Sequence, residues 1–329
     1  MSEFDLIKRY FSRPTQRAAL GGGDDCALLN PTPGTQMVVS SDMLVEGRHF
    51  FADVSPFSLG HKALAVNLSD LAACGATPVA FTLALSLPRI DHAWLQAFAD
   101  GMYALADAHG CELIGGDTTR GPLNICITVF GEVPRGQALL RSGAKVGDDV
   151  YVSGTLGDAR LALDALQGRI RLPTDMLAAT RLRLEMPTPR IALGTALRGI
   201  ATSAIDISDG LAGDLGHILQ ASGIGALVDA DITINLIAAR ARFMGAKGDF
   251  DAQFDHQKQL ETVFSGGDDY ELAFTAPPAA RSAVQAAASS SNTPVTRIGV
   301  IVSTHGLRLK DANGQLVTAE FKSFDHFAS

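Results

Sequence analysis

Glycine–aspartate clusters recur along this chain, and each lies beside a short apolar run. They read GGGDD at 21–25, GGD at 115–117 and GGDD at 266–269. Glycine lets the backbone adopt positive φ angles and approach a ligand closely, whereas adjacent carboxylates repel one another unless water or a cation relieves the repulsion. A solvated turn explains one such cluster. The repetition predicts a chain that gathers oxygen ligands at one place.

The amino-acid composition limits the number of domains and the kinds of molecule that the chain can bind. The 329 residues are 47% hydrophobic, which is ample for two domains with cores of their own. The formal net charge is −8 and the basic residues are scattered, so we expect no nucleic-acid partner. The acidic residues comprise 27 Asp and only 8 Glu. Turns and helix caps account for part of this excess, and Asp is also a compact ligand for hard cations.

The cysteines and the N-terminal sequence bear on the compartment. Cys26, Cys74, Cys111 and Cys126 lack C-x-x-C spacing and lie among apolar neighbours, which is typical of buried, reduced thiols. The sequence begins MSEFD, unlike a secretory signal peptide. The most apolar stretch, residues 63–87, is interrupted by polar residues and a proline, so it predicts no membrane-spanning helix. We therefore expect a cytoplasmic protein that associates with no membrane.

Helical and strand patterns alternate in both halves of the chain, which predicts two α/β domains. The boundary falls in a polar, glycine-bearing stretch and gives domains at 1–140 and 141–329. We interpret Asp148-Asp149 in that stretch as a solvated turn, and residues 231–255 as an irregular insertion. The expected elements include helices at 58–74 and at 91–109 with Asp91 and Gly110 as caps, and strands at 27–29, 37–42, 79–87, 111–114 and 123–133.

Polar residues inside or beside these elements are the candidate ligands. Asn67 and Asp70 are three residues apart and share one face of an expected helix, where they either face solvent or contact a ligand. Ser208 and Asp209 precede a helical pattern, at a position where free N–H groups favour anions. Six acids are candidates for one site: Asp25, Asp42, Asp70, Asp117, Asp206 and Asp209.

Six converging carboxylates require divalent cations. Two unit charges about 4 Å apart repel by roughly 4 kcal/mol at an effective dielectric of about 20, whereas Mg²⁺ would turn the set into a cage for phosphates. The chain contains no Walker A sequence, protein-kinase signature, G-x-S-x-G elbow or H-E-x-x-H pair. The residues themselves therefore predict a Mg²⁺-dependent polyphosphate site that uses aspartates and backbone amides in place of a P-loop lysine.

Eight segments, in their order and spacing, resemble the thiamine-monophosphate kinases, a family related to aminoimidazole ribonucleotide synthetase and selenophosphate synthetase. The resemblance covers nearly the whole chain, and its specificity comes from the segments together. The segments are GDDCALL at 23–29, SSDMLVEGRHF at 40–50, KALAVNLSDLAACGA at 62–76, LIGGDTTRGP at 113–122, RSGAKVGD at 141–148, AIDISDGL at 204–211, SGGDDYELAF at 265–274 and FDHF at 324–327.

The resemblance implies ATP-dependent phosphorylation of thiamine monophosphate to thiamine diphosphate, with several Mg²⁺ ions. Because the phosphate of such an acceptor is mostly ionised at neutral pH, we expect no side chain to act as a nucleophile. The resemblance also implies an N-terminal domain that binds ATP and Mg²⁺ and contributes strands to a barrel across a homodimer, and a C-terminal α/β domain that completes the nucleotide and substrate site. Positions that match the family's metal ligands are Asp25, Ser40, Ser41, Asp42, Asp70, Asp117, Asp206 and Asp209. Positions that match ATP contacts are Gly116, Asp117, Arg141 and Ser208, and those that match substrate contacts are His49, Asp268 and Phe324.

Two positions depart from the family pattern, both on the substrate side. Asp268 stands where the family usually has a thiamine-contacting Glu, and Phe324 stands where it often has Tyr. We expect a shorter carboxylate at the first position and no hydroxyl contact at the second. The metal positions are unaffected.

Two alternatives remain open from the sequence: another ATP-using member of the superfamily, or a non-catalytic nucleotide-binding protein on the same fold. Selenophosphate synthetase requires a reactive Cys or selenocysteine in its N-terminal segment, whereas residues 1–25 here contain no Cys. The motifs specific to aminoimidazole ribonucleotide synthetase are absent. A non-catalytic protein is expected to lose at least one metal position, and all six acids are present.

Overall fold

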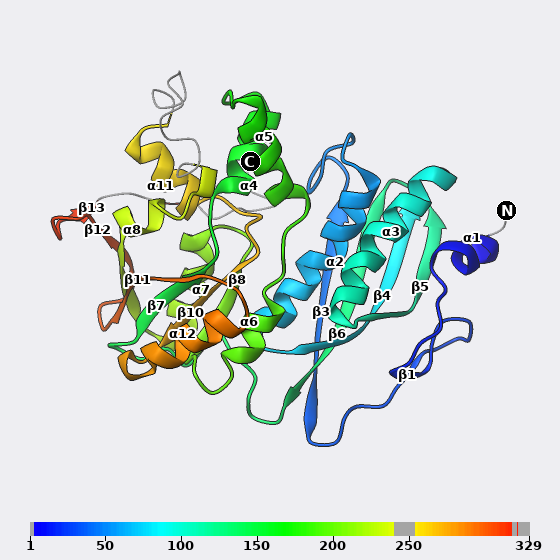
Figure 1. The fold of residues 1–329 in the computed structure, drawn as a ribbon, viewed down its shortest axis with the longest axis horizontal. Helices are drawn as coiled ribbons and strands as arrows, with labels where there is room; N and C mark the ends of the chain where they lie inside the picture. Colours follow the sequence, from blue (N-terminus) through cyan, green and yellow to red (C-terminus); the bar gives the residue numbers. More distant parts are fainter. Residues whose placement is uncertain (1–2, 240–253, 318–320, 322–329) are drawn as a thin grey trace. The chain divides into compact units, whose positions relative to one another are not determined.

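The structure, a computed structural model, describes residues 3–239, 254–317 and 321. The chain divides into two compact units (Figure 1). The first comprises residues 1–71 and 76–138, and the second comprises residues 72–75 and 139–329. None of the helices in the described ranges combines the length and the apolar character that crossing a membrane requires.

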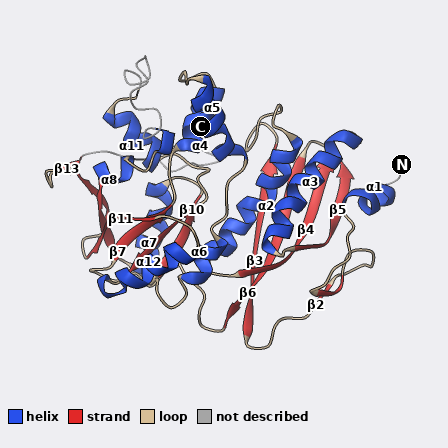
Figure 2. Cartoon of the chain, in the orientation of Figure 1, coloured by secondary structure: helices blue, strands red, loops and turns tan. Residues whose placement is uncertain are grey.

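A four-stranded sheet forms the centre of the first unit, with the strand order β3-β6-β4-β5. Strand β6 pairs antiparallel with both β3 and β4, whereas β4 and β5 run parallel. Helices α2 and α3 lie side by side over one face of this sheet (Figure 2). The elements of the unit are α1 (Glu3–Tyr10), β1 (Ala18–Leu20), β2 (Leu28–Leu29), β3 (Thr35–Val45), α2 (Pro56–Ala73), β4 (Thr77–Leu87), α3 (His92–His109), β5 (Glu112–Arg120) and β6 (Asn124–Pro134).

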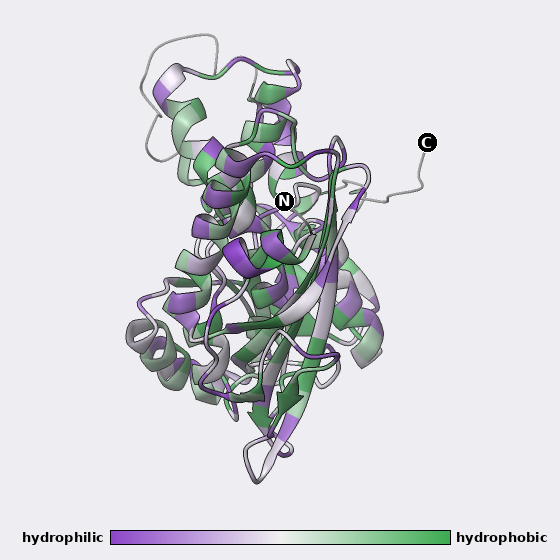
Figure 3. Cartoon of the chain, turned by 90° about the vertical axis from the view of Figure 1, so that its right-hand side faces the viewer, coloured by the Kyte–Doolittle hydropathy of each residue, from purple (hydrophilic) through white to green (hydrophobic). Residues whose placement is uncertain are grey.

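The two long helices form where the sequence predicts them. Asp91 caps α3, because its carboxylate accepts the N–H groups of Ala93 and Trp94, and Gly110 ends the helix in the left-handed region at φ 59°. The predicted caps are therefore confirmed. The helices approach closely at two glycines: a Cβ on Gly60 would lie 2.0 Å from a backbone oxygen of α3, and one on Gly101 would lie 1.9 Å from the Phe57 carbonyl. Helix α2 is buried on all sides over residues 63–69. Figure 3, coloured by hydropathy, shows that the helices of the chain carry both hydrophobic and hydrophilic residues.

Two strand predictions in the first unit are wrong in extent. The strand expected at 27–29 is only β2, which pairs with β1 in a separate two-stranded ribbon. The strand expected to end at residue 114 continues through the glycine–aspartate cluster to Arg120, because β4 offers it partners along its whole length. Gly116 makes this possible: its φ is 144°, and a Cβ there would lie 1.8 Å from the Leu83 carbonyl oxygen.

The described strands of the second unit form one mixed sheet, in the order β13-β12-β9-β11-β7-β10-β8. Strands β9 and β12 run parallel, and the other neighbours run antiparallel. The strands are β7 (Asp149–Ser153), β8 (Ser203–Ile207), β9 (Gly225–Asp229), β10 (Glu271–Ala276), β11 (Val295–Val302), β12 (Gly306–Lys310) and β13 (Leu316–Val317). The helical elements are α4 (Asp158–Leu166), α5 (Thr174–Glu185), α6 (Ile191–Ala196), α7 (Leu211–Ser222), α8 (Ala230–Ile234), α11 (His256–Phe264), η1 (Pro278–Ala280) and α12 (Arg281–Ser290).

Two interpretations of the second half need correction. Asp148 and Asp149 are 4% and 1% exposed and are not a solvated turn. Thr202 donates to Asp148 at 2.7 Å, and Arg281 binds Asp149 at 2.6 Å, so β7 begins with two buried, partnered carboxylates. The segment expected to be irregular from residue 231 begins inside helix α8, and residues 240–253 lie outside the described residues.

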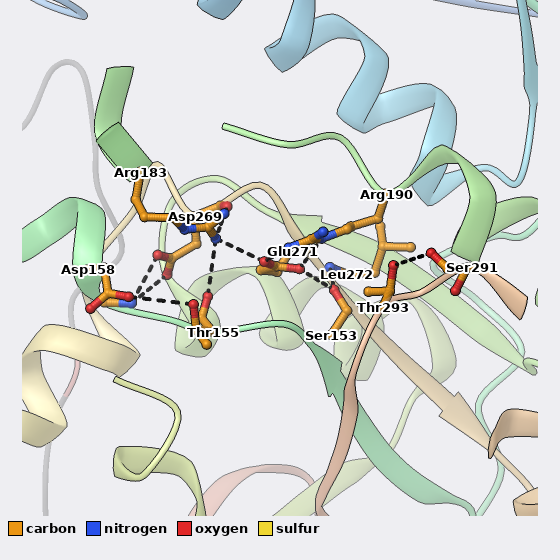
Figure 4. Close-up of polar contacts among 11 residues, drawn as sticks. Ser153, Thr155, Asp158, Arg183, Arg190, Asp269, Glu271, Leu272, Ser291 and Thr293 are labelled. Atoms are coloured by element: carbon orange, nitrogen blue, oxygen red, sulfur yellow. Dashed lines mark hydrogen bonds and ion pairs between the residues drawn. The ribbon is translucent and has the colours of Figure 1, made fainter. Parts of the chain in front are cut away.

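Glu271, at the start of β10, is a fully buried carboxylate of the second unit (Figure 4). Arg183 of α5 binds it at 2.9 Å, and Arg190, which precedes α6, binds it through two nitrogens. Ser153 of β7 donates a further hydrogen bond. Two guanidinium groups compensate the desolvated anion, so this carboxylate ties the α5–α6 segment to the sheet.

Replacing Glu271 with Ala should therefore destabilise the second unit strongly. Two buried or half-buried guanidinium groups would lose their anion, which costs about 3–5 kcal/mol. Urea unfolding measures the change. The matched control is Asp107→Ala, which removes an exposed pair with Arg13 and should change the stability by about 0–1 kcal/mol. Equal shifts in the two variants would contradict the role of Glu271.

Candidate functional site

In the first unit, strand β3 and helix α2 bring three predicted site residues together. Ser40 donates its hydroxyl hydrogen to Asp70. Asn67, which is 1% exposed, accepts the N–H of Asp42 at 3.0 Å, while its amide group donates to the Ala63 carbonyl. The prediction that Asn67 and Asp70 share one helix face is confirmed, and that face lies against β3 rather than in solvent.

The other serine of this segment points elsewhere. Ser41 donates to the Ile127 carbonyl at 3.1 Å and lies 3.0 Å from the Thr128 hydroxyl, both on β6. Alternate residues of a strand share a face, so Ser40 and Asp42 lie on one face and Ser41 on the other. The structure therefore brings Ser40, Asp42 and Asp70 together and directs the Ser41 hydroxyl away from them.

The remaining candidates of the first unit lie on separate elements. Asp25 is exposed between β1 and β2, and its N–H donates to Asp24. Gly116 and Asp117 are exposed on β5. His49 accepts the N–H of Val45 at Nδ1, at 3.0 Å, so its neutral ring carries its proton on Nε2.

Close groups of three or more His, Cys, Asp or Glu side chains able to hold a metal ion do not occur among the described residues. The oxygen donors near β3 are instead carboxylates combined with a serine hydroxyl. Their roles as metal ligands stay predictions.

In the second unit, strand β8 carries Asp206, and the turn between β8 and α7 carries Ser208 and Asp209. Asp206 is buried in β8, and the other two residues are half-buried. The N–H groups of Ser208 and Asp209 both donate to Asp214, each at 3.0 Å. These two amides are therefore engaged by a carboxyl group of the chain itself, and the roles of Ser208 and Asp209 in binding stay predictions.

Asp214 is a residue that the sequence analysis missed. Burial raises its pKa to about 7, although the two N–H groups and the positive charge of Arg141 act in the opposite direction. An acid in the first turn of a helix is common for electrostatic reasons alone, so nothing in the sequence distinguishes this one.

The GGDD segment at 266–269 packs directly against that turn. Asp268 donates its N–H to the Ser208 carbonyl at 2.9 Å, and Tyr270 donates to the Ile207 carbonyl at 2.8 Å. Asp268 and Tyr270 both have positive φ angles, 65° and 51°. Gly267 permits the contact, because a Cβ there would lie 2.2 Å from the Ser208 carbonyl oxygen. Asp268 thus lies beside Ser208, whereas Phe324 is outside the described residues.

The second aspartate of the same pair has a different role. Asp269 is 2% exposed, and its carboxylate accepts the N–H of Gly157 at the start of α4 (Figure 4). Asp158 is also buried and accepts the N–H of Ala239. Burial raises the pKa of Asp158 and raises that of Asp269 well above its ordinary value.

Asp269 should make the stability of the protein depend on pH. Because its pKa is higher in the folded state, the folded protein binds more protons than the unfolded chain above about pH 4, and stability falls as the pH rises from there toward neutrality. Asp269→Asn removes this contribution while it keeps an acceptor for Gly157. Urea unfolding midpoints are measured for both proteins from about pH 4 to 7. The midpoint of the variant should rise relative to that of the wild type as the pH rises, and a constant difference between the two would contradict this prediction.

Family models match both units. One for "AIR synthase related protein, N-terminal domain" covers residues 23–133, and one for the C-terminal domain of the same family covers residues 145–312. The thiamine-monophosphate kinase of Salmonella typhimurium is 46% identical over 332 residues, which is 99% of this chain and 98% of that protein. The chain belongs to the thiamine-monophosphate kinase family.

Solved structures of thiamine-monophosphate kinases share the fold. The crystal structure of the enzyme from Stenotrophomonas maltophilia has a TM-score of 0.81 and 45% identity, and covers 95% of this chain and 96% of its own. A structure described as AaThiL complexed with AMPPCP and TMP has a TM-score of 0.74 and 26% identity, with 98% and 96% covered. The predicted two-domain α/β class is confirmed, and the barrel across a homodimer stays a prediction.

Proposed function

We propose that this chain transfers the γ-phosphoryl group of ATP to thiamine monophosphate and forms thiamine diphosphate. The proposal is carried by its 46% identity to a thiamine-monophosphate kinase over 99% of its length. A structural relative that is complexed with AMPPCP and TMP supports both substrates.

The donor set fits Mg²⁺. This cation prefers oxygen ligands and is usually held by one or two carboxylates together with water and substrate phosphates, so a cluster of three acids is not required. Asp42, Asp70 and the Ser40 hydroxyl supply such donors on one face of β3 and α2. The proposed metal ligands are Asp25, Ser40, Ser41, Asp42, Asp70, Asp117, Asp206 and Asp209.

We assign the remaining roles to the two predicted domains, residues 1–140 and 141–329. The first domain binds ATP and Mg²⁺ and mediates dimerisation, and the second completes the nucleotide and substrate site. The proposed ATP contacts are Gly116, Asp117, Arg141 and Ser208. The proposed contacts to thiamine monophosphate are His49, Asp268 and Phe324.

The transfer needs no nucleophile from the protein. The attacking group is a phosphate oxygen of thiamine monophosphate, which is mostly ionised at neutral pH because the second pKa of a phosphate monoester is about 6. A bond forms from that oxygen to the γ-phosphorus, the bond to ADP breaks, and ADP leaves. Bound Mg²⁺ supplies charge neutralisation for the phosphates. Arg141 adds a guanidinium group, which suits phosphate oxygens, and the carboxylates hold the cations.

We also propose that the protein is a cytoplasmic homodimer. Strand β3 is at the edge of its sheet and exposes Val39 and Met43 by 56% and 53%, which supports pairing with a second copy. The four cysteines are free, which fits a reducing compartment. The expectation that all four are buried is wrong, since Cys26 is exposed and only Cys111 is buried.

The reaction is tested by incubating the protein with ATP and Mg²⁺, with and without thiamine monophosphate, and following products by mass. We expect ADP and thiamine diphosphate in equal amounts, formed only when the acceptor is present. ATP binding without thiamine diphosphate would assign the chain a different acceptor.

Asp42→Asn should reduce turnover by roughly a hundredfold or more, because a neutral amide replaces a carboxylate proposed to bind the metal. The Mg²⁺ dependence of the rate should shift to higher concentration. Asp100→Asn is the control, since Asp100 is an exposed residue of α3 whose carboxylate accepts a hydrogen bond from Gln96. Wild-type turnover in Asp42→Asn would remove Asp42 from the metal site.

A further inference from the structure

Asp214, in the first turn of α7, is 3% exposed and belongs to none of the positions proposed above to bind metal, ATP or substrate. One of its carboxylate oxygens accepts the N–H groups of Ser208 and Asp209, each at 3.0 Å. A single side chain thus fixes two consecutive peptide groups. Both belong to residues with proposed roles in binding Mg²⁺ and ATP.

The N–H groups of Ser208 and Asp209 precede the N-cap residue of α7, so Asp214 holds the turn before the helix and does not cap the helix itself. The N-cap residue of α7 is Gly210, at φ 105°, which has no side chain to accept a hydrogen bond. A Cβ at this position would lie 2.9 Å from the Phe264 carbonyl oxygen and 3.1 Å from that of Gly266. Gly210 is therefore required by close packing, and the amides of the turn before it are donors that Asp214 satisfies from within the helix.

This arrangement decides how the turn can bind a nucleotide. The amides of Ser208 and Asp209 are occupied by Asp214, and the Ser208 carbonyl accepts the N–H of Asp268. The main chain of Ser208 is therefore fully engaged. The contacts proposed here to Mg·ATP are through the Ser208 hydroxyl and the Asp209 carboxylate, whose directions depend on the two peptide groups that Asp214 holds.

We propose that Asp214 is a positioning residue that orients Ser208 and Asp209 for Mg·ATP without touching the nucleotide. The inference rests on the function proposed above. Without the acceptor, the two peptide groups are free to rotate and both side chains lose their direction. A displacement of about 1 Å at such a site lowers activity by roughly a hundredfold.

Three variants separate positioning from a general structural effect. Asp214→Ala removes the acceptor, and Asp214→Asn keeps one amide oxygen that accepts N–H groups. The control is Asp229→Ala, which removes another Asp that accepts a backbone N–H, since Asp229 caps α8 and accepts the N–H of Ile232. Each variant is measured for ATP affinity by calorimetry with Mg²⁺ and no acceptor, for kcat/KM with ATP, and for its unfolding midpoint.

We expect Asp214→Ala to bind ATP roughly 10- to 100-fold more weakly than the wild type, with a matching fall in kcat/KM. Asp214→Asn should stay within about threefold of the wild type, because it retains the acceptor. Asp229→Ala should have a lower unfolding midpoint and wild-type affinity for ATP. If the role of Asp214 were purely structural, Asp214→Ala would likewise lower the unfolding midpoint and leave the ATP affinity unchanged.

Several results would overturn the proposal. One is wild-type ATP affinity in a folded Asp214→Ala. Another is an equal loss of ATP affinity in the Asn and Ala variants, which would assign the effect to the charge.

If the Ala variant does not fold, two other results overturn the proposal. One is a more than tenfold loss of ATP affinity in Asp214→Asn, and the other is fast amide exchange of Ser208 and Asp209 in the wild type. A wild type that binds ATP but forms no thiamine diphosphate refutes the proposed function, and the affinities still test Asp214. A wild type that binds no ATP refutes both.

Discussion

Buried carboxylates that accept backbone N–H groups hold the loops of the second unit in place. Asp214 binds two amides of the turn after β8, and Asp269 binds the amide of Gly157 before α4. A buried carboxyl group is unfavourable unless it is hydrogen-bonded, so each of these two groups is tolerated only with its loop in this conformation. The turn that carries Ser208 and Asp209 is therefore fixed before any ligand arrives, as electrostatic stabilisation of a phosphoryl transfer requires.

In the first unit, neutral side chains orient the candidate site residues. The amide of Asn67 holds the main chain of Asp42, and the hydroxyl of Ser40 binds Asp70. Strand alternation then places Ser40 and Asp42 on one face and Ser41 on the other. Oxygen donors from a helix and a strand are thereby set in fixed directions.

Short-range sequence patterns correctly predicted those features of the fold that depend on neighbouring residues. The caps of α3, the shared face of Asn67 and Asp70, and the alternation of helices and strands all follow from short-range patterns. Whether an aspartate pair is buried or exposed cannot be predicted from such short-range patterns. Asp148 and Asp149 are buried because Thr202 and Arg281, 54 and 132 residues away, bind them. Likewise, β5 continues to Arg120 because β4 pairs with it, and no property of the GGDTT residues themselves reveals that partner.

The central claim is that the phosphoryl group passes directly between two anionic substrates whose surroundings are fixed in advance, with no covalent intermediate on the protein. The most direct measurement is the stereochemical course of the reaction with ATP made chiral at the γ-phosphorus by oxygen isotopes. A single in-line displacement predicts inversion of configuration in the thiamine diphosphate formed. Retention would require two displacements through a phosphorylated side chain and would contradict the account.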